Sequence, residues 1–388
     1  MIKPRLLTPG PTPVPEDVLL EMAQPVFYHR SGRFRELLAR VTQDLQYIFQ
    51  TRHTVLTLTS SGTGGMEAAL ASSLCPGAKV ICLIAGRWGE RWRNIALALG
   101  AEVVSLTVPY GEPVAPAQLE DALRAHPDTV AVCATLCETA TGVKNDIEAY
   151  GSITARTSAL LMVDAISSLG AMPCLTDEWG VDVCVTGSQK GLMLPPGLAF
   201  VSVSEKGWRV IDANKASRAF YFDLRKYRDN LTTNDAPFTP ALTLIRALAR
   251  SLAMLRSTGI ETLWAKYAGL ARMSRAGIMA MNLELFAKVP SEAMTVAAVP
   301  SGIDGNALVS NLEKWHGIKL AGGQDSLKGK IVRLAHMGYI DAFDILAALS
   351  ALELTLAKMG HALEPGAGVA AAQRELYRVS LDNASSST

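Results

Sequence analysis

Seven short and nearly continuous apolar runs lie in the first 204 residues, and they constrain the fold more than any other feature of the chain. Helical patterns such as residues 90–100 and 116–126 lie between several of them. The runs are "TVLTLT" (54–59), "KVICLIAG" (79–86), "EVVSLTV" (102–108), "TVAVCATL" (129–136), "ALLMVDAI" (159–166), "VDVCVTG" (181–187) and "GLAFVSVS" (197–204). A strand that is apolar along its whole length is buried on both faces. The pattern therefore predicts an α/β fold with a mostly parallel seven-stranded sheet between helices.

The pattern changes after this region. A long helical stretch runs from Pro240 to Met281, with Gly259 as a break, and short strand and helix patterns follow to residue 360. We predict a large domain over residues 1–258, whose first ~15 residues form a separate segment, and a smaller α+β domain over 259–365. Residues 366–388 are rich in Ala, Gly and Ser, and we expect this tail to end in disorder.

A lysine stands at the end of one apolar run. Lys190 follows the run 181–187, and Asp164 lies near the end of the run 159–166. Lysine is costly to bury, and a desolvated lysine has a lowered pKa and can form a Schiff base with a carbonyl. The pair suggests a cofactor with an aldehyde and a cationic nitrogen, and pyridoxal phosphate (PLP) has both. The alternative is a buried structural ion pair.

A second segment suggests a phosphate site. In "HTVLTLTSSGTGGMEAAL" (53–70) a strand is followed by a turn of small residues and then by a helical pattern. Such a turn exposes backbone N–H groups at a helix N-terminus, where the helix dipole attracts an anion. Ser61, Gly62 and Thr63 are the candidate phosphate contacts. Glu67 stands where a dinucleotide fingerprint needs its last glycine. The alternative is an ordinary glycine-rich turn.

Together these segments resemble the class V, fold type I, PLP-dependent aminotransferases, in particular the alanine–glyoxylate and serine–glyoxylate branch. Eight segments match in the family's order. They are "LLTPGPTPVPEDV" (6–18), "SSGTGGMEAAL" (60–70), "AGRWGERW" (85–92), "CETATGV" (137–143), "MVDAISSLGA" (162–171), "TGSQKGLMLPPGL" (186–198), "APFTPALTLI" (236–245) and "VRLAHMG" (332–338). The resemblance implies a fold type I PLP-transferase and a homodimer with active sites at the interface.

The resemblance also implies roles for single residues around the cofactor. Lys190 is the catalytic residue, bonding to the cofactor and carrying the substrate proton, and Asp164 pairs with the ring nitrogen. Trp88 stacks on the ring, with Trp92 as the competing choice. The remaining cofactor contacts that it implies are Ile166, Gln189, Thr139 and Thr239, the last reaching the phosphate of the neighbouring subunit. The alternative for Thr239 is a helix N-cap before Pro240.

Substrate contacts follow in the same way. Arg333 ends the run "KIVR", and a guanidinium can hold an α-carboxylate through two parallel bonds. The alternative is a surface arginine in a salt bridge. Pro11 belongs to the N-terminal substrate segment, and His29 either contacts substrate or caps a turn. Ala140 stands where this branch often has Ser, which removes a hydroxyl near the cofactor.

Composition narrows the class of protein. The net charge of +1 favours neither a nucleic-acid nor a membrane partner, and the sequence has no signal segment or apolar run that would span a bilayer. The six cysteines form no C-x-x-C pair and the histidines lack metal-ligand spacing, so we assign no metal and expect a reduced, cytoplasmic protein.

The expected activity is a transaminase that moves an amino group from alanine or serine to a 2-oxo acid such as glyoxylate or pyruvate, with small dicarboxylic donors still open. One alternative is another class V enzyme, a lyase or desulfurase. The desulfurase needs a reactive cysteine in the C-terminal half, and no cysteine follows Cys184. The other alternative is a non-catalytic subunit that keeps the fold. Intact Lys190 and Asp164 argue against that interpretation.

Overall fold

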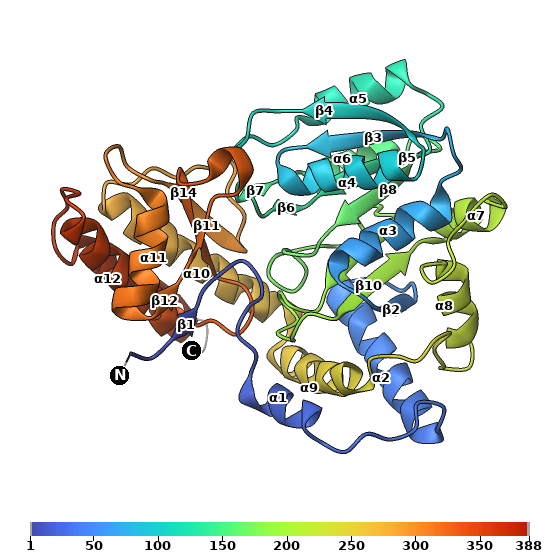
Figure 1. The fold of residues 1–388 in the computed structure, drawn as a ribbon, viewed down its shortest axis with the longest axis horizontal. Coiled ribbons are helices and arrows are strands. Elements are labelled where there is room, and N and C mark those ends of the chain that lie inside the picture. Colours follow the sequence, from blue (N-terminus) through green and yellow to red (C-terminus); the bar gives the residue numbers. More distant parts are fainter. Residues whose placement is uncertain (1, 386–388) are drawn as a thin grey trace.

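The computed structural model describes residues 2–385, with side chains described through residue 378. Its largest sheet has seven strands in the order β2–β10–β9–β8–β5–β3–β4, in the larger part of the molecule (Figure 1). β10 runs antiparallel to both of its neighbours, and the other pairings in this sheet are parallel. The strands are β2 (Val55–Thr59), β3 (Lys79–Ile84), β4 (Glu102–Thr107), β5 (Ala131–Thr135), β8 (Leu160–Asp164), β9 (Val183–Gly187) and β10 (Leu198–Val203). The predicted α/β fold with a mostly parallel sheet is confirmed.

Helices cover both faces of this sheet, which explains the apolar strands in its interior. The expected burial on both faces is wrong for β4, which is the last strand of the sheet and is partly exposed. In β8, Leu161 and Val163 pack into one hydrophobic cluster, whereas Leu160 and Met162 pack into another. The first cluster includes side chains of α2 (Gly32–Phe49), α5 (Pro116–Ala125), α6 (Ile147–Thr154) and α9 (Leu242–Thr258). The second includes side chains of α3 (Gly62–Ser73), α4 (Arg87–Ala98), α7 (Glu205–Ala213) and α8 (Leu224–Leu231).

The smaller part follows the break that the sequence predicts at Gly259, which has φ +86° and separates α9 from α10 (Ile260–Ala280). Its three-stranded antiparallel sheet has the order β11–β14–β13. The elements are β11 (Met294–Ala298), α11 (Gly305–His316), β12 (Ile318–Lys319), β13 (Ala321–Gly322), the 3-10 turn η1 (Asp325–Leu327), β14 (Ile331–Ala335) and α12 (Ala342–Lys358). Its core is continuous with the first cluster of the large sheet.

The N-terminal segment connects the two parts. β1 (Arg5–Leu6) pairs in parallel with β12 of the smaller part, and α1 (Glu16–Met22) packs against α9. Between them the chain passes the large sheet, where the backbone N–H of Thr12 donates to the carbonyl of Gln189 at 3.1 Å. Residues 7–12 therefore lie beside Lys190 although about 180 positions separate them in the sequence.

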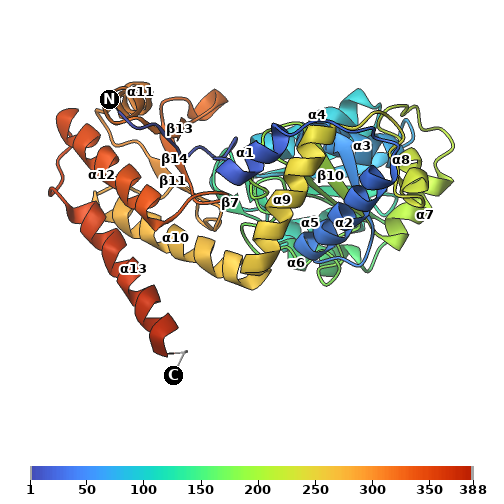
Figure 2. The same cartoon turned by 90° about the horizontal axis from the view of Figure 1, so that it is seen from below.

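The predicted tail contains a helix that the sequence analysis did not anticipate. α13 (Ala367–Ser385) lies along α10, and its far end extends away from the body (Figure 2). A Cβ at Gly368 would lie 3.0 Å from the backbone oxygen of Gly277, so glycine permits this close approach of the two helices. The end of the tail was predicted to be disordered, but α13 continues to Ser385, and the remaining residues 386–388 lie outside the described residues. Over residues 2–385 no helix has the length and apolarity needed to cross a membrane.

Candidate active site

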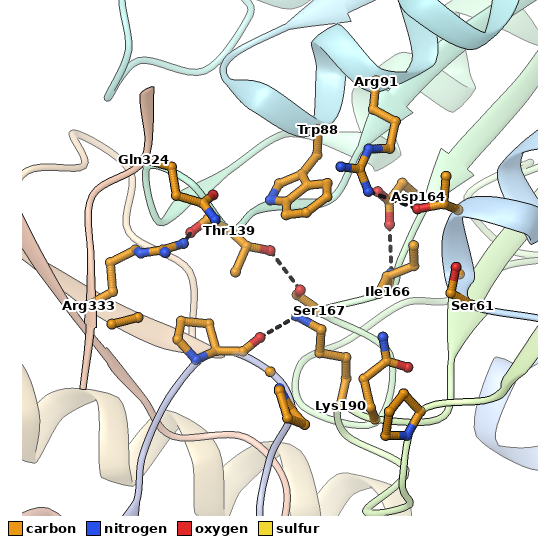
Figure 3. Close-up of a pocket in the computed structure, with 18 residues that line it drawn as sticks. Ser61, Trp88, Arg91, Thr139, Asp164, Ile166, Ser167, Lys190, Gln324 and Arg333 are labelled. Carbon is orange, nitrogen blue, oxygen red and sulfur yellow. Dashed lines mark hydrogen bonds between the residues drawn. The ribbon is translucent and has the colours of Figure 1, made fainter. Parts of the chain in front are cut away.

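A cavity of about 290 Å³ lies between the carboxyl ends of the large sheet and the smaller part, as expected for ligand sites in α/β proteins (Figure 3). It contains the predicted site residues except His29 and Thr239. Its lining consists of Pro9, Gly10, Pro11, Ser61, Gly62, Thr63, Trp88, Arg91, Thr139, Asp164, Ile166, Ser167, Gln189, Lys190, Pro196, Ala321, Gln324 and Arg333.

Lys190 extends into this cavity from the turn after β9. Its side chain is 9 % exposed, and its Nζ donates a hydrogen bond to the carbonyl of Pro9. Burial lowers the lysine pKa from 10.5 to about 8, although nearby Asp164 opposes the shift. A Cβ at Gly10 would collide with the Lys190 side chain, so the N-terminal segment needs glycine there. Lys190 is therefore a buried amine that is partly neutral near pH 7.

Asp164 is the last residue of β8 and is almost fully buried. Burial raises its pKa to about 6, against the opposing effects of the Ile166 N–H, Lys190 and Arg91. The Ile166 N–H donates to Asp164 Oδ1 at 2.8 Å and fixes the carboxylate. No ion pair joins Asp164 to Lys190 within residues 2–378, so the structure does not support the plain ion-pair alternative. Each group is instead available to a ligand between them.

The predicted phosphate cup is the N-terminus of α3. Ser61 precedes this helix and makes no side-chain capping bond, so its hydroxyl remains free to contact a ligand. Thr63 Oγ1 accepts a hydrogen bond from Arg91 Nη1 at 2.8 Å. Helix N–H groups, hydroxyls and a guanidinium thus converge on one end of the cavity, an arrangement that suits a phosphate dianion.

Of the two candidate tryptophans, Trp88 lines the cavity and Trp92 does not. Trp92 is fully buried in the second cluster and donates from Nε1 to the carbonyl of Ala134 at 3.2 Å. Trp88 lies in the first turn of α4, and the guanidinium of Arg91 stands 4.3 Å from its ring centroid. Trp88 and Ile166 both line the cavity, so a planar group bound there would contact them.

Glu138 fixes this end of α4 and was missed as a site residue. Its fully buried carboxylate accepts hydrogen bonds from the backbone N–H of Trp88 at 3.0 Å, Gly89 at 3.2 Å and Ala140 at 3.1 Å. Burial raises the pKa of Glu138 to about 8, although those three N–H groups favour the ionised form. It belongs to β6 (Cys137–Glu138), which pairs with β7 (Val143–Lys144). This hairpin also carries Thr139, whose hydroxyl donates to Ser167 at 2.6 Å.

Arg333 lies on β14 at the end of the cavity away from the cup (Figure 3). It is 6 % exposed, so the surface salt-bridge alternative is wrong. Its Nε donates to the carbonyl of Gly322 and its Nη1 to that of Thr139, both at 2.9 Å. These bonds hold the guanidinium in place, while Nη2 has no hydrogen-bond partner within the described side chains. Burial lowers the pKa of Arg333 to about 10, so the group remains cationic at neutral pH.

His29 and Thr239 lie outside this cavity. His29 is half-buried and packs edge-on against Tyr28, with 5.1 Å between ring centroids. Thr239 is exposed, and the N-cap of α9 is Ala241, so the N-cap interpretation of Thr239 is wrong. Neither residue reaches the cavity within one chain, so their proposed contacts with cofactor and substrate stay predictions.

Some lining residues were not predicted. Arg91, Ser167, Pro196, Ala321 and Gln324 line the cavity. Arg91 lies one helical turn after Trp88 in a motif already singled out, so helical spacing was an available signal for it. Gln324 and Ala321 had no comparable signal, because their contact with the cavity depends on how β13 pairs with β14.

The cavity fits PLP. Trp88 Nε1 and Gln189 Oε1 are buried without a hydrogen-bond partner among the described residues, and such atoms usually pair with something. A ligand with an aldehyde, a basic ring nitrogen and a phosphate matches Lys190, Asp164 and the cup. Fold and site together define a fold type I PLP-dependent transferase.

Comparisons with known proteins agree. Residues 6–342 match the family model of class V aminotransferases. The chain is 42 % identical over 379 residues to a protein of Synechococcus sp. named soluble hydrogenase, small subunit, with 96 % of this chain and 98 % of the relative covered. It is 36 % identical over 381 residues to the L-aspartate–glyoxylate aminotransferase of Paracoccus denitrificans, with 96 % of each covered. The solved pyridoxamine–pyruvate aminotransferase of Mesorhizobium loti has a TM-score of 0.93 at 30 % identity, with 97 % of this chain and all of that one covered.

The chain belongs to the class V aminotransferase family, and it is a PLP-dependent aminotransferase. The hydrogenase name of the Synechococcus relative is not carried over, because the family and the site of this chain are those of aminotransferases. The lyase and non-catalytic alternatives lose their support for the same reason. Likeness to transaminases extends over nearly the whole chain and includes the segment that carries Arg333.

Proposed function

We propose that this enzyme transfers the amino group of a small amino acid, alanine or serine, to a 2-oxo acid such as glyoxylate or pyruvate. The observation that carries the proposal is the place of Arg333, a buried cation at the opposite end of the cavity from the phosphate cup. It can hold an α-carboxylate while the amino group of the same molecule points toward Lys190.

Small donors are favoured by the walls of the cavity at that end. Pro9, Gly10 and Pro11 form one wall, and Lys190 Nζ is hydrogen-bonded to the carbonyl of Pro9. Among the described residues of the smaller part, Arg333 is the one cation that lines the cavity. A donor with a second carboxylate therefore lacks a partner there, and we favour monocarboxylic donors over dicarboxylic ones.

When bound, PLP supplies an electron sink for the bond that breaks at the substrate Cα. Asp164 holds a proton at the ring nitrogen through charge pairing, which preserves that sink. With a pKa of about 8, about a tenth of the Lys190 amine is neutral at pH 7. That neutral amine would take the Cα proton and deliver it to the cofactor carbon on the other side of the substrate nitrogen. Arg333 anchors the carboxylate, so that the Cα proton remains within reach of that amine. Trp88 and Ile166 orient the ring, and Ser61, Gly62 and Thr63 orient the phosphate.

We also propose a homodimer in which Thr239 of one chain contacts the phosphate site of the other. Thr239 is exposed here, and Leu20, Val26 and Tyr28, which precede His29 in the sequence, are exposed large apolar side chains. Exposed large apolar side chains are typical of interfaces. His29 would then lie at that interface, near the partner's substrate. Five of the six cysteines are buried as free thiols, which supports a reducing, cytoplasmic location.

A spectrum tests the activity most directly. Purified holoprotein should show a visible PLP absorbance band that bleaches when L-alanine or L-serine is added without an acceptor. Glyoxylate or pyruvate should then restore the band. Protein that binds no PLP, or a band that none of these donors changes, would exclude the proposal.

A further inference from the structure

Gln324 lies beside Arg333 at the substrate end of the cavity. It belongs to the loop that directly follows β13, and β13 pairs with β14 so that Ala321 is the register partner of Arg333. The Arg333 Nε donates to Gly322 in the same strand at 2.9 Å. Figure 3 shows Gln324 and Arg333 on the same side of the cavity, opposite Ser61. Gln324 is thus positioned by the strand pair that positions the carboxylate anchor.

The side-chain amide of Gln324 has an unmet hydrogen-bonding requirement. Its Oε1 is buried and has no partner within the described residues, although the residue lines the cavity. A buried carbonyl oxygen without a partner is unfavourable, because it has lost its hydrogen bonds to water. A group bound in the cavity would remove that penalty if it offered an O–H or N–H. Gln324 Oε1 therefore points to a ligand with a hydrogen-bond donor near its carboxylate.

The loop that carries Gln324 is held at several points, so the amide is not merely a surface side chain near an opening. The N–H of Gly323 donates to the carbonyl of Ile331 at 3.2 Å, and the N–H of Leu327 donates to the carbonyl of Gln324 at 2.9 Å. Asp325 forms an ion pair with Arg87 at 3.2 Å, which connects the loop to the residue next to Trp88. Anchors on both sides of Gln324 fix its backbone relative to the ring-binding and the carboxylate-binding residues.

We propose that Gln324 is a specificity-determining residue that selects a donor with a hydroxyl group on its β-carbon, serine rather than alanine. The proposal rests on the proposed function and refines its substrate. A hydroxyl can both donate and accept, so it pairs with the amide in either orientation of the amide group. The methyl group of alanine leaves Oε1 unpaired, and a carboxylate only accepts. A site built to bind a hydroxyl discriminates against an analogue that lacks it.

The test compares two donors in one holoenzyme. We would measure kcat/KM for L-serine and for L-alanine with glyoxylate as the acceptor, in the unmodified enzyme and in Gln324→Leu. The serine value should fall about tenfold, the equivalent of one neutral hydrogen bond, while the alanine value should stay within about twofold. Gln324→Met keeps the side-chain length and serves as the second variant. Ser326→Ala changes an exposed residue of the same loop and should alter neither donor.

A binding measurement separates recognition from turnover. 2-Methylserine and 2-methylalanine have no hydrogen on Cα, so absorbance titrations of the holoenzyme report binding alone. Gln324→Leu should weaken 2-methylserine about tenfold and leave 2-methylalanine unchanged.

Equal losses for both donors would overturn the proposal, because Gln324 would then serve the carboxylate or the loop. An unchanged serine-to-alanine ratio would overturn it as well. If the unmodified enzyme turned over neither donor, the proposed function would fail, while the titrations would still decide the role of Gln324.

Discussion

Replacing Arg333 by alanine tests the carboxylate anchor and separates it from the cofactor site. The side chain is 6 % exposed and makes two charged hydrogen bonds of 2.9 Å to backbone carbonyls, so the guanidinium is held before substrate arrives. Loss of a buried charged hydrogen-bonding partner costs about 2–4 kcal/mol, which corresponds to a fall of roughly 30-fold to 1,000-fold in kcat/KM. PLP content should hardly change, because the cup, Asp164 and Lys190 are untouched.

The variant should also lose stability, because the carbonyls of Thr139 and Gly322 lose their donor. Water in the adjacent cavity can form some of the lost hydrogen bonds, so we expect the free energy of unfolding to fall by about 1–3 kcal/mol. Arg333→Lys should recover part of the activity only. An ammonium group cannot hold two carbonyls and a carboxylate in the planar geometry of a guanidinium.

The assay is steady-state kinetics with an α-amino acid donor, beside a PLP titration and chemical denaturation of each variant. Suppose that Arg333→Ala loses PLP while its remaining holoenzyme turns over normally. Arg333 would then be structural, and another group would have to hold the carboxylate.

Three further predictions concern Lys190 and the assembly. Lys190→Ala should abolish turnover while PLP binding persists in part, because the phosphate and ring contacts remain; near-normal transamination with alanine and glyoxylate would refute this. PLP uptake by the apoprotein requires the neutral amine, and burial lowers the Lys190 pKa to about 8. The uptake rate should therefore rise with pH and level off above about 8, whereas N-α-acetyl-lysine, the control amine, should continue to rise toward its ordinary pKa near 10.4. If the pH midpoint of the uptake rate were the same for Lys190 and for the control amine, the lowered pKa of Lys190 would be refuted. Sedimentation at assay concentration should show a dimer, and an active monomer would remove the shared-site proposal.

Much of the fold was predictable because its signals are local. The seven apolar runs correspond to β2, β3, β4, β5, β8, β9 and β10. Burial on both faces explains the apolar residues of the interior strands, whereas β4 lies at the edge of the sheet and is partly exposed. Gly259 separates α9 from α10 as its sequence context indicated. The glycine-rich turn before α3 and the acid at the end of β8 both line the cavity, as predicted. They were predictable because a few consecutive residues are enough to indicate a strand end, a turn or a helix start.

α13 was not predicted, because its stability depends on a distant partner. Its Ala- and Gly-rich start resembles a tail when taken alone. Glycine at 368 makes sense only beside the backbone of Gly277, about 90 positions earlier in the chain. The antiparallel direction of β10 is a similar case, because an apolar run is the same in either direction.

The sequence by itself determined the fold class and the candidate residues at the large sheet, where Asp164 ends a buried strand and Lys190 and the cup each follow one. Only the tertiary structure decided which side chains complete the site. Pro9 meets Lys190, Glu138 holds Trp88, and Gln324 lies beside Arg333 because segments far apart in the chain pack together. A local sequence pattern indicates whether a residue is buried, but it does not indicate which distant residues pack against it. Contacts between distant segments form only when the whole core has assembled, and they decide what a site can recognise.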